Sequence, residues 1–244
     1  WAYSLAAWVR DMDQMTRFTH ERSGVYSYQI STNGDYGSAR GLDLTLEWRR
    51  AFFGSQLQYS YSISKANSEY AWASISGQYV DAPSQEFTTY FDRPHSLTYY
   101  AYTFLPFGIQ AGLTAFYQSG YPYTPIIFRG KDPVEDLRHR NSKRGPGYKN
   151  VNISFSKYFE FMAHKIGLGL NVFNILDIRN PVDIYAMTGK PNDPGTYYTD
   201  YVGLPGTDPS GQGKYANKSS AYYDRPWRLS SPREINFFVR IDFD

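Results

Sequence analysis

Cysteine is absent from this chain of 244 residues. So is any run of about 18 apolar residues, the length that a transmembrane helix needs. The lack of thiols suits a chain that crosses an oxidising compartment, but many cytosolic proteins share it, so it decides nothing alone. Charge of one sign is also scarce, because 25 Lys and Arg residues and 23 Asp and Glu residues leave a net charge of +2. This balance argues against a dedicated nucleic-acid-binding protein, which carries a basic face or stripe.

A signal peptide is also missing from the start of the sequence. Residues Trp1–Leu5 show no basic segment followed by an apolar core. An exported chain without one is either mature or lacks its front. Because these residues already alternate as they would inside a strand, we expect that the front is missing.

Aromatic residues are abundant, at 18% of the chain, with 24 Tyr, 16 Phe and 5 Trp. The mean hydropathy is only −0.55. This value does not exclude a membrane protein built from strands, because such strands are apolar on one face only and long polar loops lower the average.

The strongest pattern is a strict two-residue alternation, which is the period of a strand with two different faces. In one example, Leu42, Leu44 and Leu46 alternate with Asp43 and Thr45. Clean alternation covers 42–48, 56–64, 109–118, 151–156, 166–173 and 235–243, and less regular alternation covers 2–10 and 95–105. The sequence therefore predicts about eight strands, of the length that a tilted strand needs to cross a bilayer.

The connections between these strands alternate between short and long. Residues 49–55, 105–108 and 159–164 are short, whereas the long segments are 11–35, 65–94, 119–147 and 176–232. Structureless loops longer than about 15 residues are uncommon in compact soluble domains. Outer-membrane barrels combine short periplasmic turns with long extracellular loops. With this parity, the last strand runs toward the periplasm.

The two faces of the predicted strands differ in chemistry. One face is Leu, Ile, Val, Tyr and Phe, as lipid demands; the other carries small and polar residues, as a water-filled lumen demands. We predict an all-β fold, an antiparallel transmembrane β-barrel, with seven polar residues facing the lumen: Asp43, Glu47, Gln58, Gln110, Asn152, Asn171 and Arg240. An antiparallel sandwich with one solvated face is the alternative. Aromatic residues beside the short turns, such as Phe52, Phe107 and Tyr158, favour the barrel, because aromatic girdles lie at the level of the lipid headgroups.

Five segments resemble TonB-dependent outer-membrane receptors, in the order of that family. They are Tyr28–Gly34 with Gly41–Leu44, Asp92–His95 before Leu105 and Pro106, Ser119–Thr124, Asn171–Ile175, and Ser231–Asn236 with Phe243. They are similar to the family's Asn-Gly, Asp-x-x-His, Ser-Gly-x-Pro-Tyr-Thr, Asn-Leu-Phe-Asn and closing-strand patterns, respectively.

The resemblance implies a barrel of 22 strands, a plug that fills the lumen and a segment that contacts TonB. Residues 1–244 would then form the C-terminal third of one barrel domain, without the plug and the first strands. The implied location is the bacterial outer membrane. The implied partners are membrane lipid and lipopolysaccharide, the TonB complex through the missing plug, the barrel-assembly machinery and a small nutrient of unknown class.

The closing strand also resembles the signal that the barrel-assembly machinery recognises. Asn236, Ile241 and Phe243 fit the polar, apolar and aromatic positions of that signal. Phe238 stands where the family has Gly, and Asp244 follows the aromatic residue, so the match departs from the pattern at these two positions.

Signals of enzymatic chemistry are few. The four histidines, His20, His95, His139 and His164, lack the spacing of metal ligands. Asp43 and Glu47 are four residues apart on one strand face, about 13 Å, whereas paired glycosidase carboxylates need roughly 5–10 Å. We expect neither an enzyme nor a cofactor.

Two long loops are the candidates for ligand contact. The charge-dense loop 129–144 is expected to be a solvated segment with internal ion pairs, or a contact for lipopolysaccharide or an anionic ligand. Tyrosines and tryptophans on outer loops offer contact area at low entropic cost. The candidate contacts are Tyr121, Tyr123, Tyr197, Tyr198 and Trp227.

Three functions remain open on the sequence. The first is a nutrient-uptake receptor, with loops that capture the ligand and a lumen that conducts it. The second is a closed eight-stranded adhesin or anchor, which the many small polar-face residues disfavour because they would leave its interior unfilled. The third is a soluble β-sandwich that binds carbohydrate.

Overall fold

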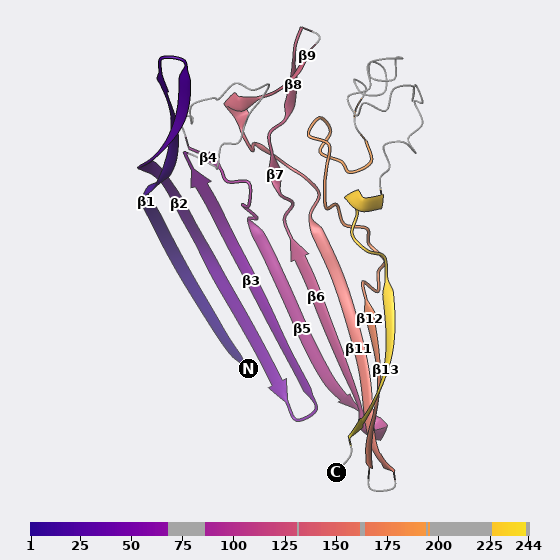
Figure 1. Ribbon diagram of the computed structural model, residues 1–244. Helices are drawn as coiled ribbons and strands as arrows, with labels where there is room; N and C mark the ends of the chain where they lie inside the picture. The colour runs from indigo at the N-terminus through magenta and orange to yellow at the C-terminus, as the bar shows by residue number, and fades with distance from the viewer. Residues whose placement is uncertain (68–85, 131, 162–163, 194, 196–225, 243–244) are drawn as a thin grey trace, which may run out of the picture.

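The computed structural model describes residues 1–67, 86–130, 132–161, 164–193, 195 and 226–242. Eight long strands dominate the fold (Figure 1). They are β1 (Ala2–Ser23), β2 (Tyr26–Arg50), β3 (Phe53–Ala66), β5 (His95–Leu105), β6 (Ile109–Gln118), β11 (Tyr148–Phe161), β12 (His164–Phe173) and β13 (Glu234–Asp242). Each of the eight predicted strands is present, so the all-β class is confirmed.

These strands form one antiparallel sheet in the order β1-β2-β3-β5-β6-β11-β12-β13. Each long strand pairs with the next long strand along the chain, and β4 (Phe87–Thr88) adds to the end of β3. In the described part of the chain, β1 pairs only with β2 and β13 pairs only with β12, so the sheet has two open edges and no closed barrel is seen.

The pairing register brings the apolar residues of all eight strands to one face. One row across the sheet runs through Leu5, Leu44, Tyr59, Leu97 and Tyr117. A second row runs through Leu113, Ile153, Val172 and Ile235. A slip of one residue in any pair would turn a whole strand over. The alternation of the sequence is therefore matched by the register of every neighbouring pair.

The apolar face is uncovered along much of its area. Leu5 is 70% exposed, Trp48 is 49% exposed and Val239 is 66% exposed. Among the described residues, the only buried hydrophobic side chains are those of Ala66, Phe87 and Val172. A sandwich would bury Leu44, Leu113 and Leu168 against a second sheet, but the other sheets of the described residues have only two strands each.

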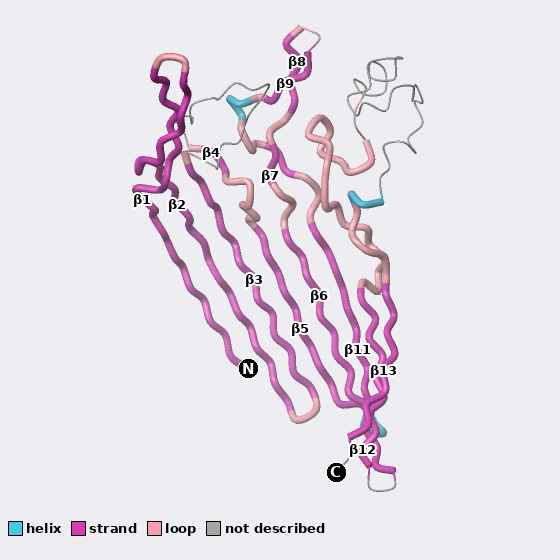
Figure 2. The backbone as a smooth tube through the Cα atoms, in the orientation of Figure 1, coloured by secondary structure: helices cyan, strands magenta, loops and turns pink. Residues whose placement is uncertain are grey.

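The short and long connections lie at opposite ends of the sheet (Figure 2). At one end, the turn at 51–52 joins β2 to β3, and η1 (Pro106–Gly108) joins β5 to β6. In η1, Phe107 and Gly108 both have positive φ, at 66° and 71°, and this reverses the chain in three residues. The start of β1 and the end of β13 lie toward this end (Figure 1).

The prediction of a long irregular segment at 11–35 is wrong. β1 continues to Ser23 and β2 begins at Tyr26, so the two strands project beyond the sheet as a paired ribbon. A turn containing Gly24, with φ of 62°, joins them, and a bulge at Gln14, with φ of 56°, marks the point where the ribbon leaves the sheet. The alternation of Tyr26, Tyr28 and Ile30 with polar residues is the signal that indicated this extension.

The segment 119–147 is also more ordered than predicted. It contains β7 (Pro122–Tyr123) paired with β10 (Lys143–Arg144), β8 (Ile126–Arg129) paired with β9 (Asp132–Glu135), and η2 (Leu137–His139). In the described parts of 176–232 the regular elements are η3 (Pro226–Arg228) and single bridges such as Pro181 with Leu229. In the part of the chain that the structure covers, no helix has the length and apolar character to span a membrane.

Candidate functional site

The polar face of the sheet holds the seven residues that the sequence predicts for the lumen. The register places Asp43, Glu47, Gln58, Gln110, Asn152, Asn171 and Arg240 on the face opposite the apolar rows. The structure therefore gathers them on one surface. That this surface lines a lumen stays a prediction.

The carboxylates of this face are bound to neighbouring side chains. Asp43 accepts hydrogen bonds from the indole nitrogen of Trp8 at 2.9 Å and from the hydroxyl of Ser60 at 2.5 Å. Glu47 accepts one from Gln56 at 3.1 Å and pairs with Arg49 at 3.1 Å. Each carboxylate thus has its own partners, on adjacent strands for Asp43 and on β2 and β3 for Glu47, and this arrangement holds charge on the polar face.

Four aromatic rings lie over glycines on neighbouring strands of the same face. The pairs are Trp8 with Gly41, Tyr102 with Gly54, Tyr158 with Gly167 and Phe238 with Gly169. A Cβ atom built on any of the four glycines would collide with its ring, at 2.7 Å for Gly41 and Gly167. Ring cover of strand glycines is a known stabilising device of sheets. The space that Gly167 and Gly169 leave on the polar face is therefore filled by the rings of Tyr158 and Phe238.

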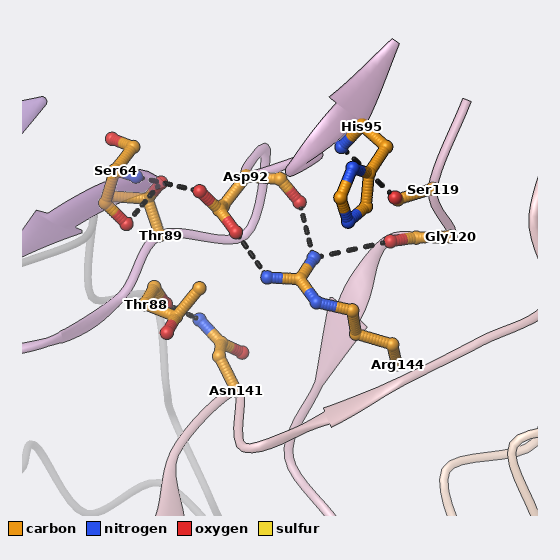
Figure 3. Close-up of polar contacts among 9 residues, drawn as sticks. All are labelled: Ser64, Thr88, Thr89, Asp92, His95, Ser119, Gly120, Asn141 and Arg144. Carbon is orange, nitrogen blue, oxygen red and sulfur yellow. Dashed lines mark hydrogen bonds and ion pairs between the residues drawn. The ribbon is translucent and has the colours of Figure 1, made fainter. Parts of the chain in front are cut away.

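Beyond the ends of the strands, on the side of the long loops, Asp92 organises a polar cluster (Figure 3). Asp92 is 3% exposed, and its Oδ1 accepts a hydrogen bond from the backbone N–H of Ser64 at 2.6 Å. Its Oδ2 pairs with the guanidinium of Arg144, which also donates to the backbone oxygen of Asp92 at 2.7 Å and to that of Gly120 at 3.3 Å. We name Ser64, Asp92, Gly120 and Arg144 the Asp92 cluster.

The Asp92 cluster joins two motifs that are far apart in the sequence. His95 and Ser119 complete the junction, because His95 N–H donates to the Ser119 hydroxyl at 3.1 Å and Ser119 N–H donates to the His95 carbonyl at 2.8 Å. Gly120 lies so close to the backbone of Gly145 and Pro146 that a Cβ would collide with both. The Asp-x-x-His and Ser-Gly-x-Pro segments therefore form one polar junction at the base of two loops.

The candidate ligand contacts Tyr121 and Tyr123 belong to this region but differ in exposure. Tyr121 is 52% exposed, and the Arg93 guanidinium lies 3.6 Å from the centre of its ring while donating to Gln118. Tyr123 is half-buried against Gly189, where a Cβ would lie 2.9 Å from the ring. Burial raises the pKa of the Tyr123 phenol above its ordinary value. Tyr121 is thus available to a ligand, whereas Tyr123 mainly packs loops together.

A second polar cluster surrounds Asn174, at the loop end of β12. Asn174 is 5% exposed, has φ of 53°, and its N–H donates to Asn152 Oδ1 at 2.9 Å. Its side-chain amide donates to the carbonyls of Ile178, at 3.0 Å, and Ser231, at 3.3 Å. Asparagine tolerates this left-handed backbone because its short amide bonds locally. The Asn171–Ile175 motif therefore holds both ends of the last long loop.

Asn180 extends this connection to β11. Its amide oxygen accepts from Lys149 N–H at 2.8 Å and its amide nitrogen donates to the Lys149 carbonyl at 2.7 Å, as a neighbouring strand would. The backbone of Asn180 exchanges hydrogen bonds with Ser230 at 2.8 and 3.0 Å. Asn180 is 2% exposed, and its side chain pairs with Lys149 of β11 beyond the point where the β11–β12 pairing ends at Ile153 and Val172.

Asn67 makes similar hydrogen bonds beside the first of the five motifs, which consists of Tyr28–Gly34 and Gly41–Leu44. Asn67 accepts a hydrogen bond from Tyr36 N–H at 2.8 Å and donates to the carboxylate of Asp35 at 3.3 Å. Asp35 is 1% exposed and follows Gly34 directly. All five sequence motifs that resemble the receptor family contribute at least one residue to the sheet or to these polar clusters.

Some predicted residues lie elsewhere or outside the described residues. Asn236 and Ile241 are in β13, on opposite faces, and Asn236 donates to Glu234 at 2.8 Å. Phe243, Tyr197 and Tyr198 lie outside the described residues. Trp227 is 67% exposed in η3.

No sequence pattern indicated a structural role for Arg144, Asn180 or Asn67. Arg144 was counted with the solvated charges of the loop 129–144, yet it pairs with Asp92, 52 positions away. Within that loop, Asp136 pairs with His139 at 2.7 Å. In the described residues no group of three or more His, Asp or Glu side chains could hold a metal ion.

No model of a known protein family matches the chain, and no curated protein matches it.

Proposed function

We propose that this chain is a segment of an outer-membrane β-barrel of the TonB-dependent receptor type, whose wall and outer loops serve the uptake of a small nutrient. The observation that carries the proposal is the uncovered apolar face, whose rows on two strands are flanked by cations, although Phe159 continues on the same face beyond Lys157. On β2 the apolar row from Leu42 to Trp48 lies between Arg40 and Arg50. On β11 the row from Val151 to Phe155 lies between Lys149 and Lys157.

The height of this apolar band fits a bilayer. Arg40 and Arg50 are ten residues apart and Lys149 and Lys157 are eight apart, which is about 33 Å and about 26 Å along the strands. Strands of outer-membrane barrels tilt by roughly 35–45°, which reduces these spans to about 19–27 Å along the membrane normal. Such barrels carry an apolar band about 25 Å tall. Lys and Arg extend from its borders toward the headgroups.

The register supports a tilted sheet independently. Lys149 is in register with Leu44, four residues from Arg40, across four strand steps. That is about 13 Å along the strand for about 19 Å across the sheet, a slope of about 35°. At the other border Arg50 is in register with Phe155, two residues from Lys157, a slope of about 20°. The borders slope in the same direction, as they do when strands tilt in a membrane.

The two open edges favour a larger barrel. Lipid offers no hydrogen bonds to the free backbone groups of β1 and β13, so membrane-spanning sheets close on themselves. We propose that further strands pair with both edges. The polar face would then line the lumen, the clusters around Asp92 and Asn174 would anchor the outer loops, and Tyr121 and Trp227 would contact the ligand. The energy would come from TonB acting on a plug domain, as the resemblance implies.

Spin labels test which face meets lipid. Because the native chain has no cysteine, single substitutions at Leu44, Leu113 and Leu168 can be labelled without background and compared with labels at Gln58 and Gln110. We expect oxygen, which concentrates in lipid, to relax the first three labels, and a water-soluble nickel chelate to relax the last two. A dry core between two sheets would shield the first three labels from both agents, and this result would refute the membrane proposal.

The proposed transport role needs a separate measurement. Native cells are compared with cells that lack the gene for growth on scarce iron, cobalamin, glycan or peptide, with and without a functional TonB complex. A growth defect on one nutrient that appears equally when TonB is removed supports uptake. Undiminished growth on all four classes, with normal insertion in the membrane, would favour an adhesin or anchor instead.

A further inference from the structure

Two open grooves lie on the apolar face, one near each border of the apolar band. The first, of about 330 Å³, is lined by Val9, Leu42, Tyr61 and Ile63 and includes Arg40. The second, of about 360 Å³, is lined by Phe155, Leu168, Phe237 and Val239 and includes Lys157. Each groove contains one charged residue, and in both cases it is a cation.

Both grooves have the same orientation relative to the band. Arg40 is in the same register row as Val9 and Ile63, and the rest of the apolar lining, including Leu42 and Tyr61, lies one row closer to the middle. Lys157 shares its row with Leu168 and Val239, whereas Phe155 and Phe237 lie one row closer to the middle. In each groove, therefore, the cation is at the outer rim and the apolar floor extends inward.

Neither cation has an acidic partner within the part of the chain that the structure describes. None of the ion pairs among the described residues involves Arg40 or Lys157, and both residues are exposed. A cation beside an apolar groove is complementary to a molecule with an anionic head and a hydrocarbon tail. An anionic lipid near a membrane surface gains about 1 kcal/mol for each Lys or Arg that it meets.

We propose that each groove binds one acyl chain of an anionic phosphate-bearing lipid, with its phosphate on Arg40 in one leaflet and on Lys157 in the other. This inference rests on the proposed function, because it requires the apolar face to lie in a bilayer. The chain packs against Leu42 and Tyr61 in the first groove and against Phe155 and Phe237 in the second. The rest of the band contacts lipid without selecting it.

Native mass spectrometry of the full protein, extracted from vesicles of phosphatidylcholine with one tenth phosphatidylglycerol, tests the proposal. Wild type should retain two phosphatidylglycerol molecules. Arg40→Gln and Lys157→Gln should each reduce the retention of one molecule by about fivefold, the factor for one lost phosphate contact. Lys149→Gln is the matched control, because Lys149 is an exposed border cation of the same face that lines neither groove.

A second variant separates the hydrocarbon site from the charge. Val239→Trp fills the Lys157 groove while the cation remains, and it should release the same lipid as Lys157→Gln. Equal losses of lipid in Arg40→Gln, Lys157→Gln and Lys149→Gln would mean that surface charge alone attracts the lipid. Unchanged retention in all three variants would also refute the proposed lipid sites. Displacement by inorganic phosphate as effective as by phosphatidylglycerol would indicate an ion site and overturn the proposal.

Failure of the grooves and failure of the proposed function give different results. If wild type does not insert in vesicles, the membrane proposal and the inference both fail. If wild type and the variants insert equally but bind phosphatidylglycerol equally, only the lipid sites fail.

Discussion

The carboxylate of Asp92 pairs with the guanidinium of Arg144 across 52 positions of the sequence, and it does so at the base of two loops. The side chain of Asp92 is 1% exposed and that of Arg144 is 33% exposed. A buried carboxylate that loses its only cation remains uncompensated, so this pair is a sensitive point of the outer region.

We expect Arg144→Gln to lower the free energy of unfolding by about 2–3 kcal/mol, because it leaves the buried charge of Asp92 without its partner. Urea unfolding of the protein in vesicles would measure this loss. Lys143→Gln removes the neighbouring exposed charge and should change stability by less than about 0.5 kcal/mol. Equal effects of both variants would show that the Asp92 cluster does not hold the loops.

The close approach of Gly120 to the next loop segment leads to a second prediction. A Cβ on residue 120 would collide with the backbone oxygens of Gly145 and Pro146, at 2.7 Å for the latter, and backbone cannot move as a side-chain tip does. Gly120→Ala should therefore cost about 1–3 kcal/mol and open the segment 119–147 to protease. Gly34→Ala is the control, since nothing lies within 4 Å of that position. Resistance of Gly120→Ala to cleavage would contradict the contact.

Charge placed on the two faces of β2 should have opposite consequences. Leu46 lies near the middle of the apolar band, and a Lys or Arg at the bilayer midplane costs about 2–4 kcal/mol in an outer-membrane barrel. Leu46→Lys should thus reduce both stability and the amount of folded protein in the membrane. Thr45→Lys, one residue away on the polar face, should be nearly neutral. If Thr45→Lys reduced the amount of folded protein and Leu46→Lys did not, the assignment of the apolar face to lipid would be wrong.

The loop ion pair of Asp136 and His139 predicts a local dependence on pH. The hydrogen bond from His139 is the main reason that the pKa of Asp136 lies below its ordinary value of 3.8. A carboxyl group with a depressed pKa in the folded state contributes stability that is present above 3.8 and is lost as the pH falls through the lower folded value.

Titration of the Asp136 carboxyl by NMR would follow this pair. His139→Ala should raise the pKa of Asp136 toward its ordinary value, because its main hydrogen bond is removed. Because His139 is exposed and both residues belong to one loop, the effect should stay within the loop and leave global unfolding unchanged. A pKa that does not move in His139→Ala would show that the backbone contacts of the loop, not His139, depress it.

Local features of the chain were well predicted by the sequence. All eight long strands, the apolar and polar sets on each, and the short turns follow from alternation and turn residues, since side-chain direction in a strand depends only on position. The ribbon at 11–35 departs from the loop that the sequence predicted, although the alternation of Tyr26, Tyr28 and Ile30 with polar residues indicates a strand there.

The sequence alone determined that each strand has one apolar and one polar face, because a period of two residues is a property of the local backbone. Only the tertiary structure decided how the strands are aligned. This alignment places Phe238 over Gly169, brings Asp92 to Arg144, and sets a single cation at the rim of each of two apolar grooves. These relationships join residues up to dozens of positions apart. They depend on the hydrogen-bond register of neighbouring strands, and no local pattern specifies that register between segments separated by long loops.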